Sequence, residues 1–216
     1  MVFWTNAPDM TPGATGRGTD NACRIAKRRR PLDDLIFARV WMRRSDQGSA
    51  MIELLDDIER AVNAKAYYLA LMGALALPDI CGCMEHADGI ATPARYQAWF
   101  DKWVGASLRG DLSGKQCYQF RCNMLHQGAT GHPHQPYTRI VFVIPGPNPW
   151  GTFGTMRADK VMHLNMLDFL NSMGVGMQKW MHTVRGTQPF ETHLERVVRT
   201  HPMGIAGAIE GLPMIG

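Results

Sequence analysis

Apolar side chains recur at helical spacing along most of the chain that follows residue 50. The first group of them predicts an amphipathic helix, because its members lie mostly three or four residues apart with acidic residues opposite. These positions are Ile52, Leu55, Ile58 and Val62. A second helix is predicted from about Lys65, and because it is apolar on most sides we expect it to be central. Pro78 is expected to end or kink this helix.

The segment after Thr92 carries the signals of a third helix. Thr92 followed by Pro93 is typical of an N-cap with proline at the first helical position. An aromatic stripe follows at helical spacing, and such a stripe predicts a face turned toward the core. It consists of Tyr96, Trp99, Phe100 and Trp103.

Ser113 opens a fourth predicted helix. Ser113 with Gln116 three residues later fits a capping box, in which each residue binds the other's backbone N–H. Gly128 supplies a left-handed stop, so the helix is expected to end at about Gln127.

Residues 138–164 interrupt the helical pattern. The β-branched run 138–144 ends in a Pro/Gly-rich stretch and predicts a strand, with which residues 160–164 are expected to pair as a short β-hairpin. Three segments follow: a helix over 165–184, a last helix over 190–200 and an apolar loop over 202–216. The predicted fold class is therefore mainly α, a helical bundle with a small β-hairpin insertion.

The first 50 residues differ from the rest in composition and charge. Residues 1–50 hold nine Lys or Arg against five Asp, which accounts for the whole net charge of +4. Residues 51–216 hold 14 basic and 14 acidic residues. We therefore predict a basic, disordered leader over 1–50, which a natural start at Met51 would remove, and a single helical domain over 51–216. The net charge gives no indication of a nucleic-acid platform on that domain.

Cysteine content and hydropathy predict a cytoplasmic protein without a membrane span. The five cysteines are an odd number and do not form the framework of a small secreted protein. The best apolar stretch, residues 67–77, is too short to cross a bilayer. The sequence also contains neither a Gly-x-Ser-x-Gly elbow nor a Walker-type loop, which argues against triad and phosphate-loop chemistry.

The residues that most indicate chemistry lie on the helix that Ser113 opens. With ~100° between successive residues, its apolar positions form a broad arc with Asn123 opposite, and Arg121 falls within the arc. An arginine cannot lose its charge on burial, so it needs a carboxylate, a phosphate or several other acceptors nearby. His126 lies at the edge of the arc in the last turn, where the helix dipole favours the imidazolium. Together the two residues can bind a phosphate and move a proton.

Arg121 and His126 are separated by four residues that include the polar Asn123, and this spacing resembles the Arg-x4-6-His motif of HEPN domains. Parts of the surrounding sequence also look like a group of uncharacterised bacterial proteins, and the resemblance covers about residues 51–130. It implies an antiparallel helical bundle that acts as a metal-independent endoribonuclease. In such a site His126 is the general acid or base, Arg121 holds the scissile phosphate and Asn123 is a polar helper.

The resemblance also implies partners and a supporting set of residues. HEPN sites are commonly built across a homodimer, and positions five apart lie ~140° apart on a helix, so they are not expected to converge within one chain. No cofactor and no metal are implied. RNA is the expected substrate, and an antitoxin-like protein is a candidate regulator. Asp79, Asp101 and Tyr118 are expected to support the site.

Three other interpretations remain open. Arg121 can form an internal salt bridge with Asp79 or Asp101, with His126 as a helix-terminal cap. A non-catalytic module for binding protein or nucleic acid would instead use the aromatic stripe and the Met-rich helix from Asn165 to Met181. A zinc site is the third interpretation. Its candidate ligands are Cys81, Cys83, His86, Cys117 and Cys122.

Overall fold

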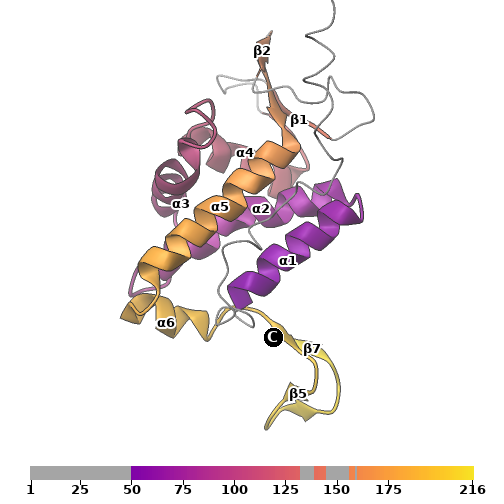
Figure 1. The fold of residues 1–216 in the computed structure, drawn as a ribbon, viewed down its shortest axis with the longest axis vertical. Coiled ribbons are helices and arrows are strands. Elements are labelled where there is room, and N and C mark those ends of the chain that lie inside the picture. The colour runs from indigo at the N-terminus through magenta and orange to yellow at the C-terminus, as the bar shows by residue number, and fades with distance from the viewer. Residues whose placement is uncertain (1–49, 132–138, 145–155, 159) are drawn as a thin grey trace, which may run out of the picture. The chain divides into compact units, whose positions relative to one another are not determined.

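The computed structural model describes residues 50–131, 139–144, 156–158 and 160–216, and these form a mainly helical protein (Figure 1). The mainly α prediction is therefore confirmed. The predicted leader lies, apart from Ala50, outside the described residues. The helices are α1 (Ala50–Asn63), α2 (Tyr67–Met84), α3 (Pro93–Phe100), the short π-helix η2 (Asp101–Gly105), α4 (Gly114–Gln127), α5 (Met166–Val184) and α6 (Gln188–Leu194).

Helix α2 is central, as its apolar sequence predicts, and it packs against α1, α3, α4, α5 and α6. Gly73 lets α1 approach closely, because a Cβ at this position would lie 2.9 Å from Cγ1 of Ile58. The helix does not end at Pro78 but continues to Met84. Burial of an apolar helix on several sides outweighs the backbone hydrogen bond that a proline removes.

Helix α2 is longer than the apolar stretch expected from the sequence, residues 67–77, because it continues to Met84. Within the described part of the chain, α2 is the one helix long and apolar enough to cross a membrane by length and composition. Half of its 18 residues are buried inside the protein. A core helix that is apolar on most sides has the same composition.

Side-chain caps begin α3 and α4 where the sequence predicts them. The Thr92 hydroxyl accepts the N–H of Arg95 at 3.3 Å. The Ser113 hydroxyl accepts the N–H of Gln116, and the Gln116 side chain accepts the N–H of Ser113 at 2.9 Å, which completes the capping box. Gly128 ends α4 with φ of 63°. Local signals thus set both ends of the helix that carries Arg121.

Aromatic side chains from distant segments meet in the core. Trp180 of α5 is fully buried and packs edge-on against Trp99 of α3, with ring centroids 6.3 Å apart. It also packs edge-on against Phe190 of α6, at 5.5 Å. Phe142 and Phe169 form a further edge-on pair at 5.1 Å. Three members of the predicted stripe are buried: Tyr96, Trp99 and Phe100.

A three-stranded sheet lies between α4 and α5 in the chain, with the order β1-β3-β2. The strands are β1 (Arg139–Val143), β2 (Met156–Ala158) and β3 (Val161–Asn165). Strand β3 pairs with β1 in parallel and with β2 in antiparallel orientation. The expected hairpin between 138–144 and 160–164 is therefore wrong. Strand β2 is too short to show an alternating pattern, and it takes the antiparallel place beside β3.

The C-terminal segment forms a bent β-hairpin instead of the expected loop. Its four strands are β4 (Thr200–His201), β5 (Gly204–Ile205), β6 (Ile209–Glu210) and β7 (Met214–Ile215). Strand β4 pairs with β7 and β5 with β6, both antiparallel. Two-residue ladders are too short for a sequence pattern to reveal. The preceding helix α6 ends at Leu194, so the prediction of a helix to residue 200 is also wrong.

Candidate functional site at the end of helix α4

Arg121 lies where α4 packs against α2. Its Nη2 is 2.7 Å from Oδ2 of Asp79 on α2, and the two side chains are 22% and 15% exposed. Charges so far removed from water need a partner, so this ion pair ties α4 to the central helix. Of the two salt bridges considered for Arg121, the one with Asp79 is therefore present.

His126 is exposed in the last turn of α4, and its Nε2 lies 3.2 Å from Nη1 of Arg121. An arginine has only donors, so the imidazole nitrogen accepts this hydrogen bond. The expectation that the two residues do not converge within one chain is wrong. The long arginine side chain spans the ~140° that separates positions five apart on a helix.

The electrostatics of the ion pair differ at its two ends. Burial raises the pKa of the Asp79 carboxyl above its ordinary value, against the opposing effects of Arg121 and His126. Burial lowers the pKa of Arg121, but Asp79 and then Cys122 raise it by more, so the net shift is upward. The ion pair therefore stabilises the charged form of Arg121. For Asp79, the loss of hydration affects the pKa more than the ion pair does. Since the contact is short, we treat both groups as charged at neutral pH.

Cys122 and Tyr118 border the same guanidinium. Nη1 of Arg121 is 3.9 Å from Sγ of Cys122. Burial and a hydrogen bond with Cys122 raise the pKa of Tyr118, whose ring packs edge-on against Tyr96 at 5.2 Å. Tyr118, predicted to support the site, thus reaches it through Cys122. The sequence does not indicate the contact between Arg121 and Cys122, because successive residues of a helix point ~100° apart.

Asn123 does not lie opposite the apolar arc, and that part of the helix prediction is wrong. Its side chain is only 5% exposed. The buried face of α4 is centred near Phe120, which contacts Phe142 of β1 with ring centroids 5.5 Å apart. The carbonyl of Asn123 accepts the N–H of Ala129 at the end of the helix. Because the sequence does not indicate which elements pack against α4, it could not indicate that Asn123 is buried.

Asp101 contacts the other end of α4. Its Oδ1 accepts the N–H of Gly114 at 2.6 Å, in the first turn of the helix. A carboxylate there is stabilised by the free N–H groups and by the helix dipole. Of the two aspartates that the sequence offered to Arg121, Asp101 is therefore not the partner, and it holds η2 against the start of α4.

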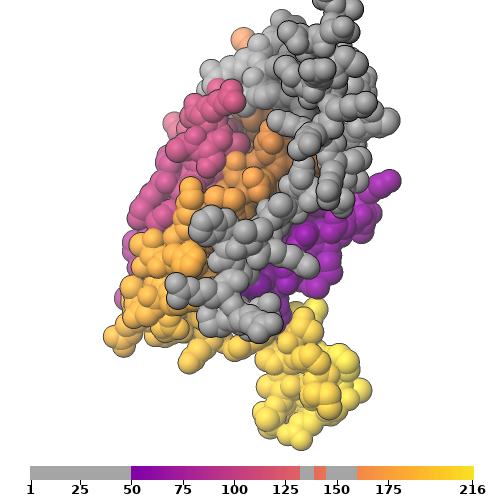
Figure 2. All heavy atoms as spheres, viewed as in Figure 1, coloured from indigo at the N-terminus to yellow at the C-terminus, as the bar shows by residue number. Residues whose placement is uncertain are grey.

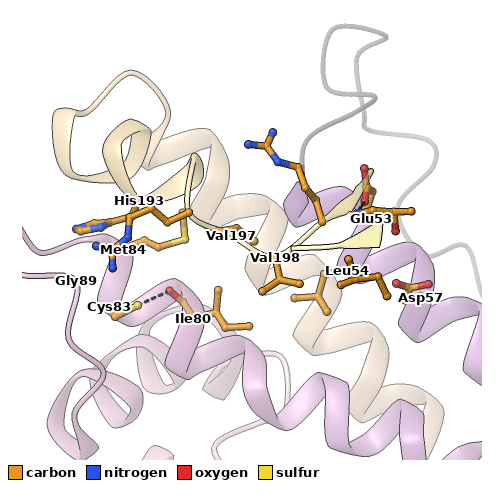
Figure 3. Close-up of a pocket in the computed structure, with 14 residues that line it drawn as sticks. Glu53, Leu54, Asp57, Ile80, Cys83, Met84, Gly89, His193, Val197 and Val198 are labelled. Atoms are coloured by element: carbon orange, nitrogen blue, oxygen red, sulfur yellow. Dashed lines mark hydrogen bonds between the residues drawn. The ribbon is translucent and has the colours of Figure 1, made fainter. Parts of the chain in front are cut away.

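Two cavities formed by described residues lie away from Arg121 and His126. One of about 440 Å³ is bounded by α1, α2, α6 and the C-terminal segment (Figure 3), and one of about 420 Å³ lies beside the start of α5. Neither is lined by Arg121 or His126. Neither of these two cavities therefore encloses the Arg121–His126 pair, in which His126 is exposed and the Arg121 side chain is 22% exposed.

The zinc interpretation finds no support in the structure. Within the described ranges, no three His, Cys, Asp or Glu side chains gather closely enough to hold a metal ion. The buried thiol of Cys117 lies 3.3 Å from the hydroxyl of Tyr96. Burial raises the pKa of Cys117 to about 12, which disfavours the thiolate that a metal would need.

Comparisons with known proteins add no assignment. No family model, no curated protein and no solved structure matches this chain. The resemblance to HEPN domains therefore stays a prediction from the motif, and the geometry at the end of α4 is the basis for a functional proposal.

Proposed function

We propose that Arg121 and His126 bind a phosphodiester and transfer a proton, and that the protein is a metal-independent endoribonuclease of the HEPN type. The observation that carries this proposal is the 3.2 Å contact between Nη1 of Arg121 and Nε2 of the exposed His126. A fixed cation beside an accessible imidazole provides both charge stabilisation and general acid–base catalysis.

Asp79 acts as a positioning residue in this proposal. Its carboxylate contacts Nη2 of Arg121 from α2. The guanidinium is planar and rigid, so a contact at Nη2 also sets the direction of Nη1 and its N–H groups. Nη1 is then presented beside His126, where a phosphate oxygen can reach it.

In the proposed reaction, a phosphate of RNA accepts the hydrogen bonds that Arg121 otherwise donates to the imidazole. Nε2 of His126 is then free to take the proton of the adjacent 2′-hydroxyl, whose oxygen attacks the phosphorus. The bond between phosphorus and the 5′-oxygen breaks, and the 5′-oxygen takes a proton from water, which leaves a 2′,3′-cyclic phosphate and a 5′-hydroxyl. His126 then releases the proton it has taken up to the solvent. Arg121 offsets the negative charge that develops on the non-bridging oxygens.

The position of the pair supports a polymeric substrate. Arg121 and His126 lie outside the cavities of about 440 and 420 Å³. The contact between the two residues is complete in one chain. The proposal therefore does not require the homodimer that the resemblance implies, although a dimer would place two such pairs on one assembly.

A second function, a non-catalytic HEPN-like binding module, is favoured by the ion pair itself. The Asp79–Arg121 contact gives the arginine a structural reason to be present without a substrate. In that case His126 is an exposed residue of the last helical turn, and its loss leaves every activity of the protein unchanged.

The test compares RNA cleavage by the full chain and two histidine variants in excess EDTA. His126→Ala removes the proposed proton-transfer group. His182→Ala is a matched control, because His182 is also an exposed histidine in the last turn of a helix, α5. Each protein is incubated with total RNA and with a labelled oligonucleotide, and product ends are identified by mass spectrometry.

The expected result is cleavage by the parent and His182→Ala, with 2′,3′-cyclic phosphate ends. Cleavage by His126→Ala is expected to fall by about 100-fold or more, the usual contribution of a general acid or base. Equal cleavage by His126→Ala and the parent would remove His126 from the mechanism. Absence of cleavage by all three proteins would overturn the ribonuclease proposal in favour of the binding module.

A further inference from the structure

The last 19 residues of the chain, 198–216, carry an unusual share of exposed apolar side chains. We call this segment the C-terminal hairpin; it is yellow in Figures 1 and 2. Nine large apolar side chains are exposed among the described residues, and five of them lie in this segment. These five are Val198, Met203, Ile209, Leu212 and Ile215, with exposed fractions between 49% and 76%. Such a cluster on a short segment is typical of an interaction surface.

The C-terminal hairpin has no core of its own. None of its 19 residues is buried. Its base is closed by two backbone hydrogen bonds between Arg199 and Gly216, and the N–H of Thr200 binds the carboxylate of Glu53 on α1. An isolated two-stranded ribbon is at best marginally stable in water. The hairpin is therefore held at its base, and its apolar side chains have no packing within it.

An apolar cavity lies beside the base of the C-terminal hairpin. It has a volume of about 440 Å³, within the range of sites that enclose apolar groups. Figure 3 shows Leu54 of α1, Ile80 of α2 and Val198 turned toward one another in it. The wall also includes Met84 and the half-buried thiol of Cys83. Figure 1 shows β5, at the far end of the hairpin, away from α1 and α2.

We propose that the C-terminal hairpin of one molecule docks into this cavity of a second copy of the same chain. Each copy has one apolar hairpin and one mainly apolar cavity. A two-fold symmetric dimer therefore buries both hairpins and both cavities. This inference does not rest on the proposed ribonuclease activity. It concerns a different surface, since the cavity wall includes neither Arg121 nor His126.

Charge and size both favour a second copy as the occupant. The hairpin carries only Arg199 and Glu210 as charged side chains. The wall of the mainly apolar cavity carries two carboxylates, of Glu53 and Asp57, and two guanidinium groups, of Arg196 and Arg199. Neither surface therefore has a charge pattern that would select a strongly acidic or basic partner. The cavity wall adds ten residues that are not in the hairpin. Together with the 19 residues of the hairpin, this set falls within the roughly 20–30 residues per partner of a stable interface.

The first measurement is the mass of the full chain in solution by light scattering after gel filtration. The parent is expected to have twice its chain mass of 24.1 kDa. Met203→Glu combined with Leu212→Glu is expected to have the single mass, because buried unpaired carboxylates at the interface are unfavourable. Both residues are at least 60% exposed, so this variant is expected to keep the parent's circular dichroism, and to match its melting temperature at concentrations low enough that the parent is also monomeric. Leu69→Glu, at a 61% exposed site on α2 that does not line the cavity, is the matched control and is expected to remain dimeric.

The second measurement locates the hairpin through the native thiol of Cys83. Alkylation of Cys83, followed peptide by peptide, is expected to be slower in the parent dimer than in the hairpin variant. Cys122, which does not line the cavity, is the internal standard and is expected to react equally in both. A monomeric parent, a dimeric hairpin variant, or equal Cys83 rates in dimer and monomer would each overturn the proposal.

Discussion

The helical body and the C-terminal hairpin of this protein are held together in different ways. The body, residues 50–194, contains every fully buried apolar side chain of the described chain, from Ala50 to Phe190. The hairpin, residues 198–216, contains none and is tied to the body at its base. The helical body is therefore stabilised by the packing of its apolar side chains. The hairpin depends on backbone pairing and on contacts that cover its apolar side chains.

The two regions also differ in how their local structure begins and ends. Helices α3 and α4 begin at hydroxyl caps that the sequence displays, Thr92 and Ser113. The turns of the hairpin depend on glycines with positive φ instead. At Gly204, with φ of 84°, a Cβ would lie 2.1 Å from the carbonyl oxygen of Ile209. Substitutions in the body should therefore change the free energy of unfolding of the whole protein. Substitutions in the hairpin should mainly change the surface of the hairpin.

The largest expected effect is in the aromatic core. Trp180→Ala should lower the free energy of unfolding by about 3–5 kcal/mol, because it removes a fully buried ring that packs against Trp99 and Phe190. Ile209→Ala, at a 49% exposed site in the hairpin, is the matched change. It should leave the unfolding free energy of the monomer within about 0.5 kcal/mol of the parent. Urea unfolding followed by circular dichroism measures both, at a concentration low enough to keep the protein monomeric. A large loss of stability in Ile209→Ala would show that the hairpin belongs to the body's cooperative unit.

A smaller effect is expected where α2 and α4 meet. Arg121→Ala leaves the Asp79 carboxylate, 15% exposed, without its cation. Removal of one member of a fully buried pair costs roughly 3–5 kcal/mol, so this partly hydrated pair should cost about 2–3 kcal/mol. Arg60→Ala removes an arginine from the exposed pair with Asp57 on α1 and serves as the control. It should not change the unfolding midpoint measurably.

The Asp79 side of this pair can be tested by a double substitution. Replacing Arg121 by Met together with Asp79 by Leu leaves no charge without a partner, and should restore most of the stability that Arg121→Ala loses. If the double variant is no more stable than Arg121→Ala, the ion pair is not what links α4 to α2.

The sequence predicted the parts of the fold and the site that depend on neighbours along the chain. The capping box at Ser113 and the stop at Gly128 placed α4, and with it Arg121 and His126. Which side of α4 is buried depends on elements that are distant in the chain, such as β1, whose Phe142 contacts Phe120, and the prediction for Asn123 failed. No local pattern states which strand covers which helix face.

Distance along the chain also explains why the sequence could not decide which aspartate pairs with Arg121. Asp79 and Asp101 were both chemically suitable. Only the packing of α2 against α4 brings Asp79 to the guanidinium, while Asp101 binds the first turn of α4. The His126 contact is local but needs an extended arginine rotamer, which helix angles alone do not predict.

A change at a helix cap should have a moderate effect. Ser113→Ala removes the hydroxyl that accepts the N–H of Gln116 and breaks the capping box. It should cost about 1 kcal/mol, within the usual range for N-cap substitutions. Ser113→Asp keeps an acceptor at the N-cap and should retain most of the stability. Thermal unfolding of the two variants beside the parent measures the difference, and an unchanged midpoint in Ser113→Ala would show that the Asp101–Gly114 hydrogen bond holds this end of α4 without the cap.

The smallest expected effect is a dependence on pH at the turn between α2 and α3. Asp88 accepts two hydrogen bonds from the guanidinium of Arg95 and one from the N–H of Ile90, and these bonds lower its pKa from 3.8 to about 2. A lowered folded-state pKa gives stability that is present above the ordinary value and is lost as the pH falls through about 2. The advantage of the parent over Asp88→Asn should therefore shrink between about pH 5 and about pH 2. Chemical denaturation at a series of pH values tests this, and a constant difference between the parent and Asp88→Asn would mean that the Arg95 contact does not stabilise the body in solution.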